Sequence, residues 1–110
     1  MIQIFGVKSC NDTKKALRFF KDRKIEVQFI NLKEKEISKG ELKSITKTYD
    51  IEELLDREGK EFKKRNLEYY HFDTLELLME SPTLYKTPIL RDRDKVTIGY
   101  KPEVWKEWVK

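Results

Sequence analysis

The chain has 110 residues, of which 40% are charged, but its net charge at pH 7 is only +4 and it contains one cysteine and one histidine. These counts exclude an internal disulfide, and they exclude a zinc or iron–sulfur cluster built from the chain's own cysteines and histidines. Acidic and basic residues are mixed, as in residues 31–36, and no apolar run approaches the roughly 18 residues of a membrane helix, so we expect neither direct nucleic-acid binding nor a membrane span.

A strand and a helix are predicted at the start of the chain, with the cysteine between them. Ile2, Ile4 and Phe5 indicate the strand. The helix is indicated by residues at helical spacing, namely Thr13, Ala16, Leu17 and Phe20. Cys10 therefore lies near a helix start, where unpaired N–H groups and a partial positive charge favour the thiolate. The nearby lysines would add to this effect: Lys8, Lys14 and Lys15. We interpret Cys10 as a candidate nucleophile, the alternative being a small buried apolar side chain.

The middle of the chain is predicted to be a second strand followed by helices. Ile25, Val27 and Phe29 alternate with polar residues, so strand, helix and strand form a βαβ unit with parallel strands. Residues 38–41 have the spacing of a capping box, for a helix that continues its apolar stripe to residue 49. We expect Asp50 to cap a short helix. Residues 61–66 are expected to form a further helical turn, and residues 73–81 are expected to form a helix. The buried stripe expected in that last helix is Leu75, Leu78 and Met79.

The last third is predicted to be a hairpin and a helix. Residues 89–91 and 96–98 are strand-like, with the polar turn 92–94 between them. Pro102 can open the final helix. The residues expected to face the sheet from that helix are Val104, Trp105, Trp108 and Val109. We expect residues 1–110 to form one domain, without a linker or repeat.

The order βαβ…ββα, with a cysteine after the first strand, predicts an α/β, thioredoxin-like (glutaredoxin-like) fold. Its sheet would be mixed and four-stranded, with a helical segment inserted between strands 2 and 3. In that fold a cis proline before the third strand lies against the cysteine, and Thr87-Pro88 occupies its place. The alternative for Thr87-Pro88 is an ordinary proline at the start of an edge strand.

The sequence resembles the arsenate reductase (ArsC) family, which also contains the Spx-type regulators that bind bacterial RNA polymerase. The resemblance covers essentially the whole chain. It rests on these segments: Ile4-Phe5-Gly6, Ser9-Cys10-Asn11, Lys14-Lys15-Ala16, Leu54-Leu55-Asp56-Arg57, Thr87-Pro88-Ile89-Leu90 and Ile98-Gly99-Tyr100-Lys101-Pro102. The resemblance depends on the order and spacing of these segments more than on any single segment.

The resemblance implies a set of site residues. In the glutathione- and glutaredoxin-coupled arsenate reductases one cysteine attacks the oxyanion, which three arginines hold. Cys10 matches the cysteine and Arg57 the first arginine, whereas Thr87 and Lys101 occupy the other two positions. Lysine cannot copy the planar fork of arginine, so we expect arsenate reduction to be poor. Asn11 and Pro88 complete the expected substrate-binding residues, and for Arg57 the alternative is a surface ion pair with Glu53 or Asp56.

A thiol-dependent oxidoreductase with glutathione-type monothiol chemistry is the function that we expect. Thr13 occupies the third position after Cys10, so there is no local resolving thiol, and glutathione or glutaredoxin would have to act as the reductant. No bound cofactor is expected, and a reducing cytoplasm is the natural compartment. The alternative is an Spx-like regulator that binds RNA polymerase. Against it, the chain lacks the regulators' Cys-x-x-Cys pair and reads Tyr49-Asp50 where they carry a glycine.

Overall fold

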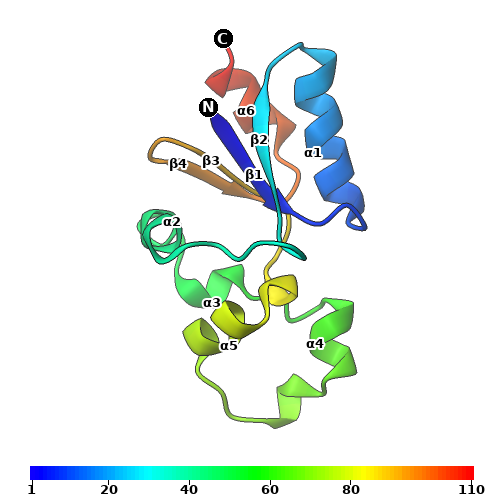
Figure 1. The fold of residues 1–110 in the computed structure, drawn as a ribbon, viewed down its shortest axis with the longest axis vertical. Coiled ribbons are helices and arrows are strands. Elements are labelled where there is room, and N and C mark those ends of the chain that lie inside the picture. The colour runs from blue at the N-terminus through cyan, green and yellow to red at the C-terminus, as the bar shows by residue number, and fades with distance from the viewer.

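A computed structural model describes the whole chain, residues 1–110, and contains one mixed four-stranded sheet in the order β2-β1-β3-β4 (Figure 1). The strands β1 (Ile2–Gly6) and β2 (Val27–Asn31) are parallel. The strands β3 (Ile89–Asp92) and β4 (Lys95–Ile98) form an antiparallel hairpin, and β3 is antiparallel to β1. The predicted α/β fold class, with parallel strands first and a hairpin last, is confirmed.

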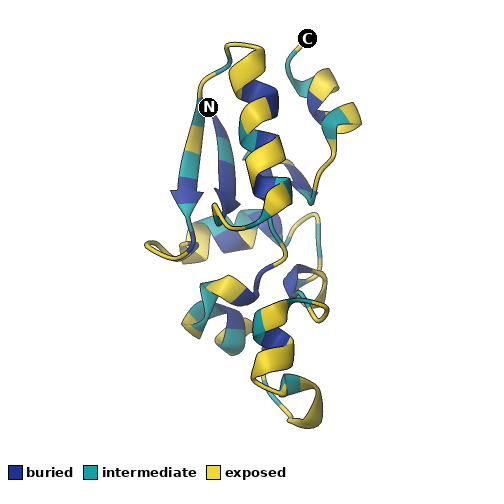
Figure 2. Ribbon diagram, turned by 90° about the vertical axis from the view of Figure 1, so that its right-hand side faces the viewer, coloured by how far each residue is buried: buried dark blue, intermediate teal, exposed yellow.

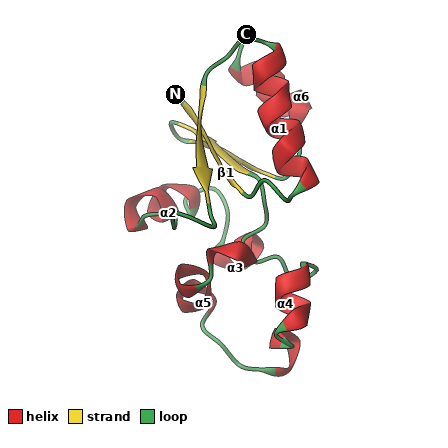
Figure 3. Ribbon diagram, turned by 45° about the vertical axis from the view of Figure 1, so that its right-hand side comes forward, coloured by secondary structure: helices red, strands yellow, loops and turns green.

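Two helices cover one face of the sheet, as Figure 3 shows. They are α1 (Asn11–Asp22) and α6 (Pro102–Trp108). Their apolar residues pack with the sheet into a cluster of buried residues: Ile2, Ile4, Ala16, Phe19, Phe20, Leu90 and Trp105. The indole N–H of Trp105 donates a 2.8 Å hydrogen bond to the Thr97 hydroxyl, so this buried aromatic side chain also satisfies its polar atom.

The segment between β2 and β3 forms the predicted helical insertion. It contains the helices α2 (Lys39–Ile45), α3 (Ile51–Leu54), α4 (Lys60–Lys64) and α5 (Thr74–Glu80), with 3-10 turns η1 (Leu67–Tyr69) and η2 (Pro82–Leu84). In Figure 1 the insertion lies beyond one end of the sheet and both termini lie at the other, so the molecule is elongated, with extents of 44 × 26 × 24 Å.

A second core joins the insertion to the sheet. Phe5, Ile30, Ile89 and Val96 contribute from the strands, and the rest comes mainly from the insertion. Figure 2 shows buried residues in both parts of the molecule. An isolated antiparallel bridge pairs Leu55 with Tyr85 just before β3. The insertion is therefore fixed to the end of the sheet where β1 runs into α1.

Side-chain caps set the starts of the inserted helices. Ser38 accepts a hydrogen bond from the N–H of Glu41 at the start of α2, and Asp50 and Asp73 cap α3 and α5 in the same way. All three predicted caps are confirmed. The predicted helix of residues 61–66 is α4, which begins one residue earlier and ends two earlier.

Three expectations about helices are wrong. The helix predicted to reach residue 49 ends at Ile45, because Thr46 caps it and residues 46–48 form turns. Leu75 remains 44% exposed on α5 and Val104 remains 36% exposed on α6. Both helices have only seven residues, so each buries a narrow stripe, centred on Leu78 and Trp105, and turns its neighbours outward.

No helix is long and apolar enough to cross a membrane, and the longest, α1, has 12 residues.

Candidate functional site

Cys10 lies at the start of α1, as the sequence predicts. The turn that leads to it is closed by a 3.0 Å hydrogen bond from the Cys10 N–H to the Val7 carbonyl. Cys10 is the N-cap residue of α1, with φ −84° and ψ 123°, and its carbonyl accepts the first helical hydrogen bond from the Lys14 N–H. The side chain is partly exposed, so a substrate in solvent can reach the sulfur.

The segment before β3 lies against this cysteine. The Thr87–Pro88 peptide bond is cis, which confirms the sequence prediction. The Cys10 thiol donates a hydrogen bond of 3.6 Å to the Thr87 carbonyl, although the two residues are 77 positions apart. The fold therefore brings the first helix start and the cis-proline segment together around one sulfur atom.

The surroundings of the sulfur favour its ionised form. Burial raises the pKa of the Cys10 thiol, but the hydrogen bonds that the ionised sulfur can accept from the Thr87 hydroxyl, from the backbone and hydroxyl of Thr13 and from the backbone of Asp12 together outweigh burial and lower the pKa below its ordinary value. These lowering interactions come from the helix start and from the cis-proline segment. None of them comes from a lysine, so the nearby lysine charges that the sequence suggested are not the cause.

An open groove of about 710 Å³ extends from Cys10 toward the insertion. Its walls come from the turn before α1, the residues after β2, helix α4 and the segment 80–87. The charged residues that line the groove are Lys33, Asp56, Lys60, Glu61, Arg65 and Glu80. Arg65 pairs with Glu61 at 2.7 Å, whereas Lys33 and Lys60 take part in none of the ion pairs of the protein. The groove beside the sulfur therefore carries two unpaired cations.

Thr87 separates this groove from a second one. A pocket of about 460 Å³ on its other side is lined by Lys86, Thr87 and Lys101, together with Tyr49, Glu53, Asp56, Ile98 and Gly99. Lys101 and Thr87 are thus brought together as the sequence suggested, but Lys101 does not line the groove of Cys10. Pro88 is buried behind Thr87, and Asn11 is exposed on the first turn of α1 without lining either groove.

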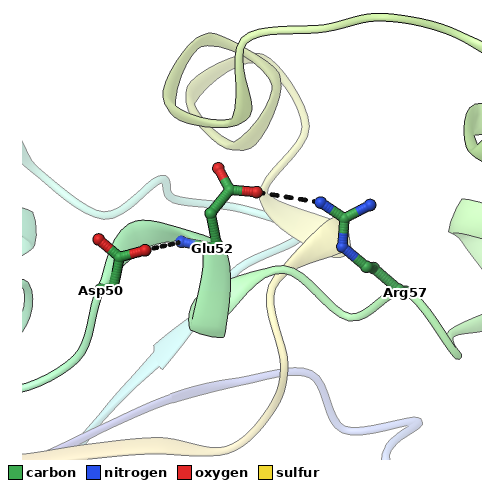
Figure 4. A network of polar contacts seen from close by, with 3 residues as sticks. All are labelled: Asp50, Glu52 and Arg57. Carbon is green, nitrogen blue, oxygen red and sulfur yellow. Dashed lines mark hydrogen bonds and ion pairs between the residues drawn. The ribbon is translucent and has the colours of Figure 1, made fainter.

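Arg57 lies away from the cysteine, in a third pocket. Figure 4 shows its guanidinium turned toward Glu52, with a nitrogen–oxygen distance of 3.0 Å. The guanidinium carbon also lies 5.8 Å and 5.7 Å from the ring centroids of Phe62 and Phe72. The sequence left two interpretations of Arg57, an anion-binding residue or a surface ion pair. The structure shows the surface ion pair, with Glu52 rather than Glu53 or Asp56 as the partner.

Sequence reasoning missed most of the groove. Lys33 follows β2, Lys60 begins α4, and Glu80 ends α5, so only the folded insertion brings them to Cys10. In a chain with 40% charged residues nothing in the local sequence distinguishes these side chains from other surface charges. The signal that could have found them is topological, because all three flank loops at the end of the sheet that also holds Cys10.

The protein is a thioredoxin-like domain with a single thiol, as its sheet order, its cis proline and the cysteine at the start of its first helix define. Solved structures of the YffB (PA3664) protein and of a glutaredoxin have the same fold. The sequence model of the ArsC family matches residues 5–108, so the chain belongs to the ArsC family. The chain is 33% identical over 106 residues to the regulatory protein MgsR of Bacillus subtilis, covering 92% of this chain and 84% of MgsR.

Two further relatives are named differently, one as a regulator and the other as an arsenate reductase related protein. The global transcriptional regulator Spx 2 of Oceanobacillus iheyensis is 32% identical over 104 residues, covering 90% of this chain and 76% of Spx 2. The solved structure of an arsenate reductase (ArsC) related protein from Brucella melitensis is 28% identical, with a TM-score of 0.69 over 99% of this chain and 94% of that one. The relatives of this chain therefore include both regulators and reductase-related proteins.

Proposed function

We propose that this protein is a thiol-dependent oxidoreductase that uses Cys10 in monothiol exchange with glutathione. The observation that carries the proposal is the position of the Cys10 sulfur, at a helix N-cap, beside the cis-proline segment and at the edge of an open groove. Hydrogen bonds at this position lower the thiol pKa, and the thiolate is the form of cysteine that attacks disulfides.

The exchange has two balanced steps. The Cys10 thiolate attacks one sulfur of a mixed disulfide between glutathione and a second thiol, so a bond forms between Cys10 and the glutathione sulfur and the second thiol leaves as its thiolate. A glutathione thiolate then attacks the Cys10–glutathione disulfide, which releases glutathione disulfide and restores the Cys10 thiolate. The chain contains no second cysteine, so an external thiol must complete the cycle.

The charges of the groove suit glutathione. The tripeptide carries two carboxylates and one ammonium group. Lys33 and Lys60 are the unpaired cations beside Cys10, and Glu80 is a carboxylate without an ion-pair partner in the same groove. We therefore assign the carboxylates of glutathione to the two lysines, with Thr87 forming the wall beside the sulfur and Pro88 buried behind it. In this proposal Lys101 and Arg57 are not the main anion contacts.

The test is the pH dependence of Cys10 alkylation by iodoacetamide, combined with mass spectrometry after exposure to oxidised glutathione. We expect a pKa below the ordinary cysteine value of about 8.5 and a single glutathione adduct, which reduced glutathione removes. A pKa at or above that ordinary value would contradict the proposal, and so would the absence of an adduct. Cys10→Ser supplies the control, since it should give neither signal.

Regulation of transcription through RNA polymerase is the second candidate. The identities to MgsR and Spx 2, both named as regulators, support it. Binding of purified RNA polymerase to the immobilised protein separates the two candidates. Stoichiometric binding that survives Cys10→Ala would favour the regulator, whereas the oxidoreductase proposal expects no retention of polymerase above a column that carries an unrelated protein.

A further inference from the structure

The pocket on the far side of Thr87 from Cys10 has no role in the exchange with glutathione. It has a volume of about 460 Å³, and two of the residues that line it are Lys86 and Lys101. Both lysines are exposed, and neither takes part in any ion pair of the protein. This pocket, which we call the Lys86 pocket, therefore offers two unpaired cations to a ligand that arrives from solvent.

The two carboxylates that line the same pocket already have partners. Glu53 accepts the Asp50 N–H at 2.8 Å in the capping box of α3, and Asp56 accepts the Glu58 N–H at 3.2 Å in the turn after α3. No ion pair joins either carboxylate to a lysine. The charge left without a partner in the Lys86 pocket is therefore positive, and the net charge of +4 on the whole chain also favours the approach of an acidic ligand.

Thr87 connects the Lys86 pocket to the reacting sulfur. It lines both this pocket and the groove of Cys10, and its carbonyl oxygen lies 3.6 Å from the Cys10 sulfur. The wall is held in place beside Thr87, because the Lys86 N–H donates a 2.7 Å hydrogen bond to the Leu54 carbonyl. A ligand that lies across Thr87 can therefore place one part in each cavity and keep the bond between its parts beside the sulfur.

The chemistry of the exchange calls for two such cavities. When the Cys10 thiolate attacks the glutathione sulfur of a mixed disulfide, the second thiol leaves from the opposite side of that sulfur, so the two halves of the substrate extend in different directions. The groove beside Cys10 takes the glutathione half in the proposed function. The half that carries the second thiol then needs its own site, and the Lys86 pocket is the cavity that shares Thr87 with the groove.

We propose that this second half is an acidic peptide segment of a glutathionylated protein, with its carboxylates bound by Lys86 and Lys101. The protein then removes glutathione preferentially from cysteines that acidic residues flank. In that step a bond forms between the Cys10 sulfur and the glutathione sulfur, the original disulfide bond breaks, and the peptide thiol leaves as its thiolate. External reduced glutathione restores the Cys10 thiolate, as in the proposed function. The inference rests on the proposed function, because it names the other half of the same substrate.

Three blocked peptides test this assignment. Each carries glutathione on its single cysteine, which is flanked by glutamates, by glutamines or by lysines. The release of free peptide in the presence of reduced glutathione is followed by mass spectrometry, and each rate is divided by the uncatalysed rate of the same peptide. At low ionic strength we expect the acidic peptide to react about fivefold faster than the neutral one, the size expected of two exposed charge pairs. The basic peptide should be the slowest, and added salt should reduce the differences.

Three variants locate the charge that the peptides sense. Lys86→Glu combined with Lys101→Glu should remove the preference for the acidic peptide, and both lysines are exposed, so the exchange disrupts no buried contact. Lys106→Glu should keep the preference, because Lys106 is exposed on α6 and lines neither cavity. Lys33→Glu combined with Lys60→Glu alters the groove of the glutathione half, which all three peptides share, so it should slow the three peptides alike.

The outcomes separate this inference from the proposed function. Equal normalised rates for the three peptides in the wild type would overturn the acidic-peptide assignment and leave the proposed function standing. A preference lost in the Lys33 and Lys60 variant, but kept in the Lys86 and Lys101 variant, would overturn it as well, because the selection would then lie in the groove of Cys10. If no peptide lost its glutathione to Cys10, the proposed function and this inference would both be wrong.

Discussion

Gly6 and Thr13 lie so close that a methyl group on Gly6 would be 2.6 Å from the Thr13 hydroxyl oxygen. Gly6 is the last residue of β1 and Thr13 is in the first turn of α1, so this contact fixes the strand end against the helix start. We expect Gly6→Ala to lower the free energy of unfolding by about 1–3 kcal/mol, the usual cost of overpacking a core. Urea unfolding followed by circular dichroism measures the change.

Gly40 provides the control for that substitution. It lies in α2 with no atom within 4 Å of an added β carbon, and alanine is the better helix former. Gly40→Ala should therefore raise the free energy of unfolding by about 0.5–1 kcal/mol. If the two variants had the same stability, the contact between Gly6 and Thr13 would not be a packing constraint.

The second prediction concerns the charges of the Cys10 groove. Exchanging Lys33 and Lys60 together for glutamate should slow the reaction of Cys10 with oxidised glutathione about tenfold, because exposed charge pairs each contribute up to about 1 kcal/mol. The rate is followed by the loss of free thiol under stopped flow. The uncharged bis(2-hydroxyethyl) disulfide should react at an unchanged rate once any shift of the Cys10 pKa has been taken into account.

Lys106→Glu is the control variant, because Lys106 is exposed on α6 and does not line the groove. It should react with both disulfides like the wild type. Equal slowing with the charged and the uncharged disulfide would mean that Lys33 and Lys60 do not recognise the carboxylates of glutathione.

Arsenate is expected to be a poor substrate. Arg57 is paired with Glu52 in another pocket, and Lys101 lies on the far side of Thr87. The one arginine that lines the Cys10 groove is Arg65, and its guanidinium is already paired with Glu61. Arsenate should protect Cys10 from iodoacetamide less than twofold at millimolar concentration. Assays with glutathione and glutaredoxin should detect little arsenite.

Thr87→Arg tests the reason for that expectation. Thr87 contacts Cys10 and lines its groove, so an arginine there should increase arsenate protection, whereas Thr83→Arg adds the same charge to the groove at a residue without a contact to the sulfur. Efficient arsenite formation by the wild type would show that arginine forks are not what limits this site.

Much of the fold could be predicted because its signals are local. The alternation at Ile25, Val27 and Phe29 and the caps at Ser38, Asp50 and Asp73 depend on near neighbours in the sequence. The caps gave the expected helices, and the alternation gave β2, which begins at Val27 and leaves Ile25 outside the strand. Thr87–Pro88 was predicted to be cis from topology together with the fold's known pattern. Local patterns failed at Leu75 on α5 and Val104 on α6, where the helical period is right but each seven-residue helix buries only a narrow stripe and turns these side chains outward.

The site was predictable only around the sulfur. The helix start at Cys10 follows from the residues beside it. The partner of Arg57 depends on how α3 ends, so the spacing in the sequence cannot choose among Glu52, Glu53 and Asp56. The groove depends on contacts between segments far apart in sequence. The close approach of Gly6 to Thr13 likewise becomes visible only in three dimensions.

The last prediction concerns alkaline pH and Tyr85, a buried residue that pairs with Leu55 in the isolated antiparallel bridge just before β3. Burial first, and the negative charge of Glu36 second, raise the pKa of Tyr85 to about 12 from an ordinary value of 10. Because the folded-state pKa is the higher one, the folded protein binds more protons than the unfolded chain between pH 10 and 12. The stabilisation linked to this proton is fully present below pH 10 and is lost as the pH rises to 12.

Across that interval the wild type should lose about 2–3 kcal/mol more of its free energy of unfolding than Tyr85→Phe, which has no proton to lose. Urea titrations at closely spaced pH values measure the difference, in which the titration of the many lysines cancels. Tyr69→Phe is the matched control, because Tyr69 is exposed and its substitution should leave the wild-type pH dependence in place. Parallel curves for the wild type and Tyr85→Phe would mean that the Tyr85 hydroxyl is not held in its protonated form by the fold.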